Sequence, residues 1–359
     1  MRSRIPGAVA VAALVAVAAA PAASRVHLAL ARGLPQPVAG RGWTARLTVR
    51  PASFAGTVRV TAAGTTRLSV RATGGRGAYR ARLVFPTAGH WTLTGRAGGT
   101  TSRLGSVVVR ARPRTPLTFV WPTSIDAEPG GSLLVVENGL ERVLRVDTAT
   151  GRVTTLASGI SKAYAVARAP SGSVYVSGAH DLFRIEGAAP PVRVAEADSD
   201  LGPIAVSPAG DVYFATATQI FVVRGGSSPP APVSTAQLAA PHGLAVTRDG
   251  TLLVSDTGHG RVLLIDPATG GATTFAAIDE PRGVDVAADG SVYVVDARAK
   301  RVLHLSASGE RLGFAGPAFT DPYDVAVAPD GAQYVVDTAV AGRVLRVAAD
   351  GTATPLSRG

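Results

Sequence analysis

The stretch that decides the fold occupies residues 241–266 and reads PHGLAVTRDGTLLVSDTGHGRVLLID. Two later segments repeat its pattern: PRGVDVAADGSVYVVDARAKRVLHL at residues 281–305 and PYDVAVAPDGAQYVVDTAVAGRVLRV at residues 322–347. Each copy contains an apolar run, an Asp-Gly turn, a second run that ends in aspartate, a polar loop and a third run that starts Arg-Val. Three tandem copies of one unit predict a repeat architecture.

Alignment on the first turn glycine finds three earlier copies of this unit. The six copies begin 41, 38, 40, 40 and 41 residues apart, at Pro122, Ala163, Leu201, Pro241, Pro281 and Pro322. Alternating runs separated by glycine-centred turns predict four antiparallel strands per unit, because Asp-Gly pairs favour hairpin turns. A unit of four strands cannot bury its own faces. We therefore expect six units to stack around an axis as a six-bladed β-propeller.

The length of 359 residues predicts more than one domain. The chain has no cysteine, which excludes disulfides, thiol nucleophiles and thiolate metal sites. Residues 1–23 combine Arg2 and Arg4 with an apolar run and an Ala-Pro-Ala site, which predicts a signal peptide. The run is shorter than the roughly 20 residues that cross a membrane, so an N-terminal anchor is disfavoured. We expect a secreted or extracytoplasmic protein, and a monomer.

The formal charge of +11 hides a division between two parts of the chain. Residues 24–125 contain 16 arginines and no Asp or Glu, whereas residues 126–359 carry a net charge of −7. A basic surface attracts polyanions. The first part is therefore predicted to contact an anionic envelope polymer or lipid surface, and export disfavours nucleic acid as the partner.

Residues 24–112 alternate between apolar and polar positions in six or seven short runs. This period of two predicts half-buried strands and an immunoglobulin-like β-sandwich. Residues 113–116 are predicted to be a linker, and residues 117–359 the propeller. Residues 117–121 and residues 352–356 are alternative candidates for the strand that closes the ring. The predicted core of the sandwich consists of Trp43, Phe54, Tyr79, Phe85 and Trp91.

Two resemblances follow from these motifs. Residues 77–93, GAYRARLVFPTAGHWTL, resemble the small secreted sandwiches called YtkA-like, over about 20 residues. Copper binding, which that resemblance suggests, is disfavoured because only His27 and His90 are present there. The six units resemble NHL repeats over about 240 residues, and residues 256–262 are the closest copy of the family's Asp-to-Arg-Val segment. This likeness implies the architecture but not the function, because such propellers include binding modules, adhesive sensor domains and enzymes.

The second residue of each unit is predicted to lie near the propeller axis, at the upper mouth of the channel. These positions hold a mixed polar and aromatic set, which resembles a ligand mouth. A solvated end of the stacked blades is the alternative. Arg282 would favour an anionic group of the ligand. The candidate ligand-binding residues are Tyr164, His242, Arg282, Tyr323 and the adjacent Asp324.

The same positions argue against a metal enzyme. Lactonase-like propellers hold a divalent ion in the channel, and amidating-lyase propellers use three histidines, whereas this mouth offers one histidine and one carboxylate. A catalytic zinc needs at least three protein ligands, and calcium needs more oxygens. We therefore expect no cofactor, with calcium unsupported. The favoured function is a non-catalytic module that binds a protein, glycan or small molecule. The alternative is a metal-dependent lactonase-like hydrolase or lyase.

Two further features concern the loops at the upper mouth. Asp256, Asp296 and Asp337 recur at one repeat position, so we expect them to bind loop amides and to pair with Arg261, Arg301 and Arg343. Blades 2 and 3 have 15 residues between their turn glycines, against 19 or 20 elsewhere. Short upper loops there predict a notch, and an ordinary solvated loop is the alternative. The acids predicted to line it are Glu196, Asp198 and Asp200.

Overall fold

The computed structural model describes residues 26–112, 115–234, 236–339 and 341–358. The predicted signal peptide, residues 1–23, and positions 113–114 of the predicted linker lie outside these residues. The chain divides into two compact units, Met1–Pro113 and Arg114–Gly359. In the part that the structure describes, no helix has the length and apolarity needed to cross a membrane.

The first unit consists of seven strands whose order in the sheet is β1-β2-β5-β4-β3-β6-β7. Their bounds are β1 His27–Leu30, β2 Gly42–Arg50, β3 Val58–Ala63, β4 Arg67–Gly75, β5 Ala78–Val84, β6 Gly89–Ala97 and β7 Thr100–Val109. Strand β4 changes partner along its length. Its first six residues pair with β3 and its last three with β5. Strand β1 also contacts β7, which brings the two ends of the sheet together.

The alternation of apolar residues in these strands builds one core. Trp43, Tyr79, Phe85 and Trp91 are buried, as predicted, whereas Phe54 is only half-buried. The ring of Phe85 lies between the two tryptophans, at 5.9 Å from Trp43 and 5.2 Å from Trp91. Both indole N–H groups donate to backbone carbonyls, so the tryptophans bury no unsatisfied donor.

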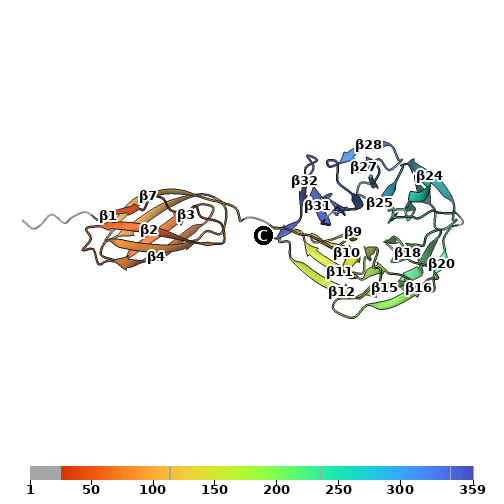
Figure 1. Cartoon of the computed structure of the whole chain (residues 1–359), viewed down its shortest axis with the longest axis horizontal. Coiled ribbons are helices and arrows are strands. Elements are labelled where there is room, and N and C mark those ends of the chain that lie inside the picture. The colour runs from red at the N-terminus through yellow and green to blue at the C-terminus, as the bar shows by residue number, and fades with distance from the viewer. Residues whose placement is uncertain (1–25, 113–114, 235, 340, 359) are drawn as a thin grey trace, which may run out of the picture. The chain divides into compact units, whose positions relative to one another are not determined.

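The second unit is a ring of six four-stranded antiparallel sheets, which confirms the predicted six-bladed propeller (Figure 1). Blades 1 and 2 comprise β9 Pro122–Glu128, β10 Ser132–Glu137, β11 Arg142–Asp147, β12 Val153–Ser158, β13 Val166–Arg168, β14 Val174–Ser177, β15 Asp181–Ile185 and β16 Val192–Glu196. Blades 3 and 4 comprise β17 Ile204–Val206, β18 Val212–Ala215, β19 Ile220–Val223, β20 Ala231–Pro232, β21 Gly243–Val246, β22 Leu252–Asp256, β23 Arg261–Ile265 and β24 Ala272–Ala277. Blades 5 and 6 comprise β25 Pro281–Val286, β26 Val292–Asp296, β27 Arg301–Leu305, β28 Arg311–Ala315, β29 Pro322–Val327, β30 Gln333–Asp337, β31 Arg343–Val347 and β32 Ala353–Pro355.

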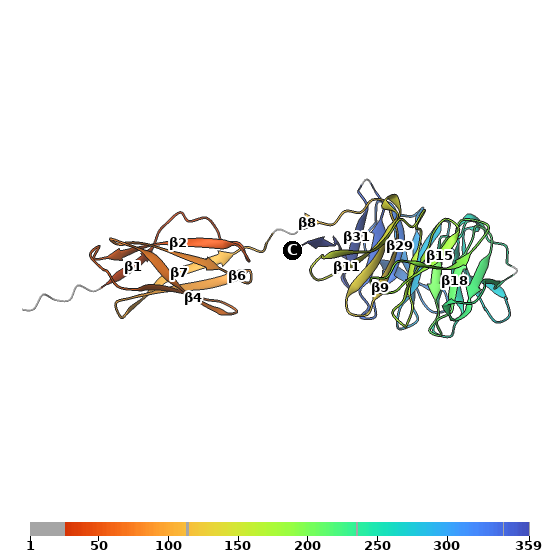
Figure 2. The same cartoon turned by 90° about the horizontal axis from the view of Figure 1, so that it is seen from below.

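The first strand of each blade lies nearest the axis. These six strands contact one another around the whole ring, and Figure 2 shows the blades from the side. The opening proline of a unit pairs with the acid at the end of the second strand: Pro122 with Glu137, for example, and Pro322 with Asp337. This end of the propeller is called the upper face below.

The ring closes through both segments that the sequence left as alternatives. The tail forms β32, the outer strand of blade 6, and continues as β33 Ser357–Arg358, which pairs with β8 Thr115–Pro116. Leu117 N donates to Leu356 O at 2.7 Å, and Phe119 N to Gly342 O at 2.8 Å. The two ends of this unit therefore join between blades 6 and 1, where Leu117, Phe119 and Leu356 share one apolar cluster.

Blades 2 and 3 are shorter at the upper face, but by less than the glycine spacing suggested. Their second hairpins end one residue pair early, at Ser177↔Leu182 in blade 2, whereas blade 4 continues to Asp256↔Arg261. Blade 2 has five fewer residues between its turn glycines than blade 4. Three of these five are not a real shortening, because the turns before β16 and β24 both have six residues and differ only in where the glycine stands. Blades 2 and 3 thus lack the acid–arginine pair that tops blade 4.

Candidate functional site

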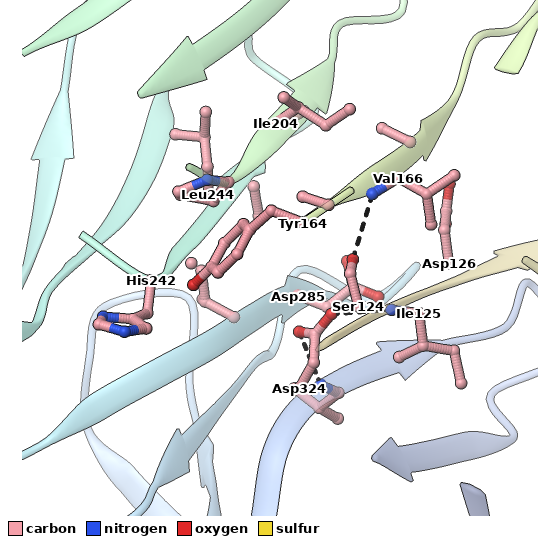
Figure 3. Close-up of a pocket in the computed structure, with 18 of the residues that line it drawn as sticks. Ser124, Ile125, Asp126, Tyr164, Val166, Ile204, His242, Leu244, Asp285 and Asp324 are labelled. Atoms are coloured by element: carbon pink, nitrogen blue, oxygen red, sulfur yellow. Dashed lines mark hydrogen bonds between the residues drawn. The ribbon is translucent and has the colours of Figure 1, made fainter. Parts of the chain in front are cut away.

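A cavity of about 180 Å³ occupies the channel, lined by the first strands of all six blades. Its aspartate side chains lie on one side of the channel (Figure 3). Figure 3 shows Asp285 and Asp324 beside Ser124, with Asp126 nearby, whereas Ile204 and Leu244 lie on the opposite side. The three aspartates come from blades 5, 6 and 1, whereas Ile204 and Leu244 come from blades 3 and 4; Tyr164 and Arg168 of blade 2 and His242 of blade 4 also line the cavity.

The three channel aspartates link neighbouring blades. In each case a carboxylate oxygen accepts a hydrogen bond from a backbone N–H of the next blade, so that the junctions 5/6, 6/1 and 1/2 are bridged. The bonds run from Val327 N to Asp285 (2.7 Å), from Ile125 N to Asp324 (2.9 Å) and from Arg168 N to Asp126 (2.6 Å). Asp324, predicted at the ligand mouth, therefore lies in the channel wall and takes part in closing the ring.

Burial raises the pKa of all three carboxyl groups, to about 6 for Asp126 and about 7 for Asp285 and Asp324. The hydrogen bonds from backbone N–H groups oppose this shift, and repulsion between neighbouring carboxylates adds to it. All three residues line the cavity. Nevertheless, no group of three or more His, Asp or Glu side chains among the described residues could hold a metal ion.

An aromatic cluster lies at the upper end of the channel. Tyr164, His242 and Tyr323 come from blades 2, 4 and 6, and their ring centres are 6.1–6.4 Å apart. The Tyr323 hydroxyl donates to the Tyr164 hydroxyl at 3.2 Å. The guanidinium carbon of Arg282 lies 5.1 Å from the centre of the Tyr323 ring. Four of the five predicted mouth residues thus meet at one place.

Arg282 already has two anionic partners. Its guanidinium group lies 2.8 Å from Glu280 and 3.2 Å from Asp321, and its side chain is only 20% exposed. Its charge is thus balanced within the protein, which leaves less of it for an anionic ligand than the sequence suggested.

The hydrogen bonds of His242 indicate which ring nitrogen carries the proton. Its Nδ1 lies 2.9 Å from Ala240 O, and because a carbonyl can only accept, Nδ1 carries the proton of the neutral ring. Nε2 is then the unprotonated nitrogen. Burial lowers the pKa of His242, and the nearby charge of Arg282 lowers it further. The neutral ring can therefore accept a proton or a hydrogen bond at Nε2 at neutral pH.

An open hollow of about 580 Å³ lies on the upper face beside this cluster, over the shortened blades 2 and 3. Tyr164 and His242 line both the hollow and the channel cavity, so they form the wall between the two. We call this space the upper hollow. Its lining consists of Asn138, Lys162, Tyr164, Gly178, Asp200, Leu201, Gly202, Thr216, Ala217, Ala240, Pro241 and His242.

The upper hollow is not lined by three acids. Asp200 lines it and pairs with Lys162 at 2.8 Å. Glu196 ends β16 and pairs with Arg193 at 2.9 Å, and Asp198 is exposed outside the lining. Sequence reasoning missed Asn138, Lys162 and Thr216, because the only signal for them was the shorter blades.

Strained backbone surrounds the upper hollow. Trp121, Lys162 and Ala240 adopt left-handed φ angles of 50°, 49° and 45°, and each directly precedes the opening residue of its blade. Such a conformation costs a non-glycine residue roughly 1–2 kcal/mol and is concentrated at functional sites. Lys162 and Ala240 line the hollow. Trp121, whose carbonyl accepts from the N–H of the lining residue Asn138, is 64% exposed.

The recurring aspartates of the second strands are structural, as predicted, with one exception. Asp256 accepts from Ala239 N and pairs with Arg261, each at 2.8 Å. Asp337 likewise accepts from Asp321 N and pairs with Arg343. The prediction for Asp296 was wrong in one respect, because Arg301 lies 4.9 Å from the ring centre of Phe314 instead.

Comparison with known proteins identifies the architecture. The family model of the NHL repeat matches residues 238–263, from just before blade 4 into its third strand, and no curated protein matches the chain. A protein of unknown function from Bacteroides thetaiotaomicron is 16% identical, with 89% of this chain and 98% of that chain covered and a TM-score of 0.56.

Two enzymes share the propeller fold. A catalytically inactive histidine-to-alanine variant of virginiamycin B lyase from Staphylococcus aureus, with quinupristin, is 15% identical (68% of this chain, 87% of that chain, TM-score 0.53). A gluconolactonase from Xanthomonas campestris is 17% identical (65% of this chain, 88% of that chain, TM-score 0.55). At these identities the likeness establishes the fold alone.

Proposed function

We propose that the propeller is a ligand-binding module whose site is the upper hollow, with Tyr164 and His242 as its inner wall. The observation that carries this proposal is the hollow itself. Its volume of about 580 Å³ lies within the range of small-molecule sites, roughly 300–1,000 Å³. The strained Lys162 and Ala240 in its lining support the assignment, since proteins retain such strain mainly where function requires it.

The lining favours a neutral or zwitterionic polar ligand. Lys162 and Asp200 balance each other, and His242 is neutral at neutral pH because its pKa is lowered. Trp121 is hydrogen-bonded to the lining residue Asn138, and Leu140 follows Asn138 by two residues; both are exposed and offer an apolar surface near the hollow to a ring or an alkyl group of the same ligand. A glycan or a modified sugar meets both requirements.

The test is a binding screen of the full-length protein against sugars, amino sugars, lactones and amino acids by thermal shift, followed by calorimetry. We expect His242→Gln and Lys162→Ala each to weaken binding about tenfold, the usual value of one or two lost hydrogen bonds. His304→Gln is the matched control, because His304 stacks on Tyr293 in blade 5, outside the hollow. Binding that survives both hollow variants would refute this site.

A lyase or hydrolase that uses the same hollow is the second candidate. The unprotonated Nε2 of His242 supports it, as does the fold shared with a lyase and a gluconolactonase. The metal-dependent form has less support, because the described residues offer no cluster of metal ligands. Turnover of a lactone panel that is lost in His242→Gln would establish an enzyme. A chelator would then show whether the reaction needs a metal ion.

We also propose that the N-terminal domain is an immunoglobulin-like sandwich. Its strand order supports this assignment, because β1-β2-β5-β4 and β3-β6-β7 correspond to the A-B-E-D and C-F-G sheets of that fold. Strand β4 spans both sheets. An experimental structure in which the two sheets pack face to face would support the assignment, and a closed single-sheet barrel would contradict it.

Export of the protein is a further part of the proposed function. The motif in residues 1–23 supports it. Sequencing of the mature N-terminus should find cleavage near residue 23, in protein recovered from outside the cytoplasm. An intact Met1 in that material would contradict cleavage.

A further inference from the structure

Three arginines form a row on one outer face of the N-terminal domain. Strands β4, β3 and β6 are neighbours, and their register places Arg59 directly opposite Arg71 on one side and Arg96 on the other. All three side chains are exposed, because alternate residues of these strands face solvent. We call Arg71, Arg59 and Arg96 the arginine row.

The arginine row is unfavourable for the domain on its own. Like charges directly opposite each other destabilise a sheet. Residues 26–112 contain no Asp or Glu, so no carboxylate side chain of the domain can neutralise the row. Solubility needs only scattered charges of both signs. A cationic row held in register without counter-charges therefore indicates an anionic partner that supplies them.

The groups around the row fit phosphate esters. A guanidinium group binds phosphate through two parallel hydrogen bonds. Neighbouring strands lie 4.7–4.9 Å apart, so the three guanidinium groups span about 10 Å across the sheet. The next row of the same face consists of Ser69, Thr61 and Thr94 and ends in Arg103. Its hydroxyl groups are additional donors for phosphate oxygens.

We propose that the arginine row is the docking site for a linear polyanion whose charges are phosphodiester groups along one chain. A lipid bilayer fits less well, because surfaces that bind bilayers combine cations with Trp, Phe or Leu side chains. Among the described residues of this domain, the large apolar side chains counted as exposed are Val84 and Val108. The face is thus cationic and hydroxyl-rich, and it lacks groups that would enter a membrane.

The test compares two triple variants of the full-length protein with poly(glycerol phosphate) of defined length as the probe. Arg59→Gln/Arg71→Gln/Arg96→Gln removes the row. Arg41→Gln/Arg50→Gln/Arg110→Gln removes the same charge from exposed positions outside the row: Arg41 precedes β2, Arg50 faces His27 and Arg110 faces Val38. We expect the row variant to lose about tenfold or more in affinity. The slope of log affinity against log salt concentration should fall in magnitude by about 2, because each of three lost phosphate contacts on a single-stranded polyanion contributes about 0.7. The control should lose much less.

Thermal unfolding checks whether a loss of affinity comes from misfolding of the variant. The row variant should unfold at the same or a higher temperature, because it relieves repulsion between opposed charges. Equal losses of affinity in the two variants would overturn the proposal, since net charge alone would then explain binding. Tighter binding to phosphatidylglycerol vesicles than to the polymer would overturn it as well, as would an absence of binding at low salt.

Discussion

At the scale of single residues, the upper hollow is held by backbone that is strained. Ala240 has a left-handed φ although it is not glycine, and its carbonyl orients the imidazole of His242. The strain is stabilised by its surroundings, since Ala240 N donates to Ala217 O at 3.0 Å. The conformation of Ala240 therefore connects the stability of the propeller to the geometry of the candidate site.

The substitution Ala240→Gly should stabilise the propeller by about 1 kcal/mol, because glycine adopts a left-handed φ without steric cost. Urea unfolding of the full-length protein measures the change. Ala205→Gly is the control, since Ala205 lies within β17 and has no left-handed φ. It should destabilise by about 0.5–1 kcal/mol. Destabilisation by Ala240→Gly would show that Ala240 is not strained.

The repeated aspartates should differ in importance despite their equivalent positions. Asp256 is fully buried and bonded to Ala239 N, His259 and Arg261, so Asp256→Asn should cost about 2–3 kcal/mol. Asp296 binds only Ala299 N among the bonds found for its side chain, and Asp296→Asn should cost below about 0.5 kcal/mol. Chemical denaturation compares the two variants. Equal losses of stability in the two variants would mean that the position in the repeat, and not the contacts of the side chain, sets how much each aspartate contributes to stability.

At the scale of secondary-structure elements, the first strands of blades 5, 6, 1 and 2 are joined by channel carboxyl groups. Each junction places an acid in a poorly solvated cavity, and burial favours its neutral form. The bridges therefore hold more protons in the folded protein than the same residues would in the unfolded chain. This difference ties the stability of the ring to pH.

The free energy of unfolding should fall as pH rises from about 4 to about 7 and then level off. The unfolded pKa of aspartate is about 3.9, whereas Asp126 titrates near 6 and Asp285 and Asp324 near 7, so the folded state binds more protons across this window. The loss should be on the order of 10 kcal/mol, because the pKa of each of three carboxyl groups is raised by about 2–3 units and each unit corresponds to about 1.4 kcal/mol. His242, whose pKa is lowered, acts in the opposite direction, but as one group against three.

Urea denaturation at pH 5, 6, 7 and 8 measures this dependence. In Asp285→Asn the slope should become shallower, because the variant lacks one of the three titrating groups. A stability that rises with pH between 5 and 7 would contradict the account of the channel.

Much of the architecture could be predicted from the sequence, and less of the site. Repeat spacing predicts the blades because each glycine-centred turn is a local property of a few residues. The meeting of Tyr164, His242 and Tyr323 was also predictable, since equivalent repeat positions lie around one axis. Hydrogen-bond and ion-pair partners that lie in different blades could not be predicted. Nothing local indicates that Asp324 binds Ile125 N, or that Arg282 is already held by Glu280 and Asp321.

At the scale of the whole molecule, the propeller depends on closure between blades 6 and 1. A chain that ends at Phe319 lacks blade 6 and exposes the apolar faces of blades 5 and 1, so it should aggregate or lose cooperative unfolding. Removal of residues 357–359 alone is the control. It deletes β33 and thus its pairing with β8, and the protein should stay folded with a lower melting temperature. A soluble, monomeric and cooperatively folded chain that ends at Phe319 would rule out an obligatory closed ring.

The central claim, that Tyr164 and His242 form the wall of a ligand site, is tested most directly by NMR of the full-length protein with nitrogen-15 in its six histidine rings. At pH 7 the account predicts a neutral His242 ring protonated at Nδ1. It also predicts that the ligand found in the binding screen shifts the His242 signals and leaves those of His304 unchanged. A charged His242 ring, or a ligand that shifts other histidines and leaves His242 unaffected, would contradict the account.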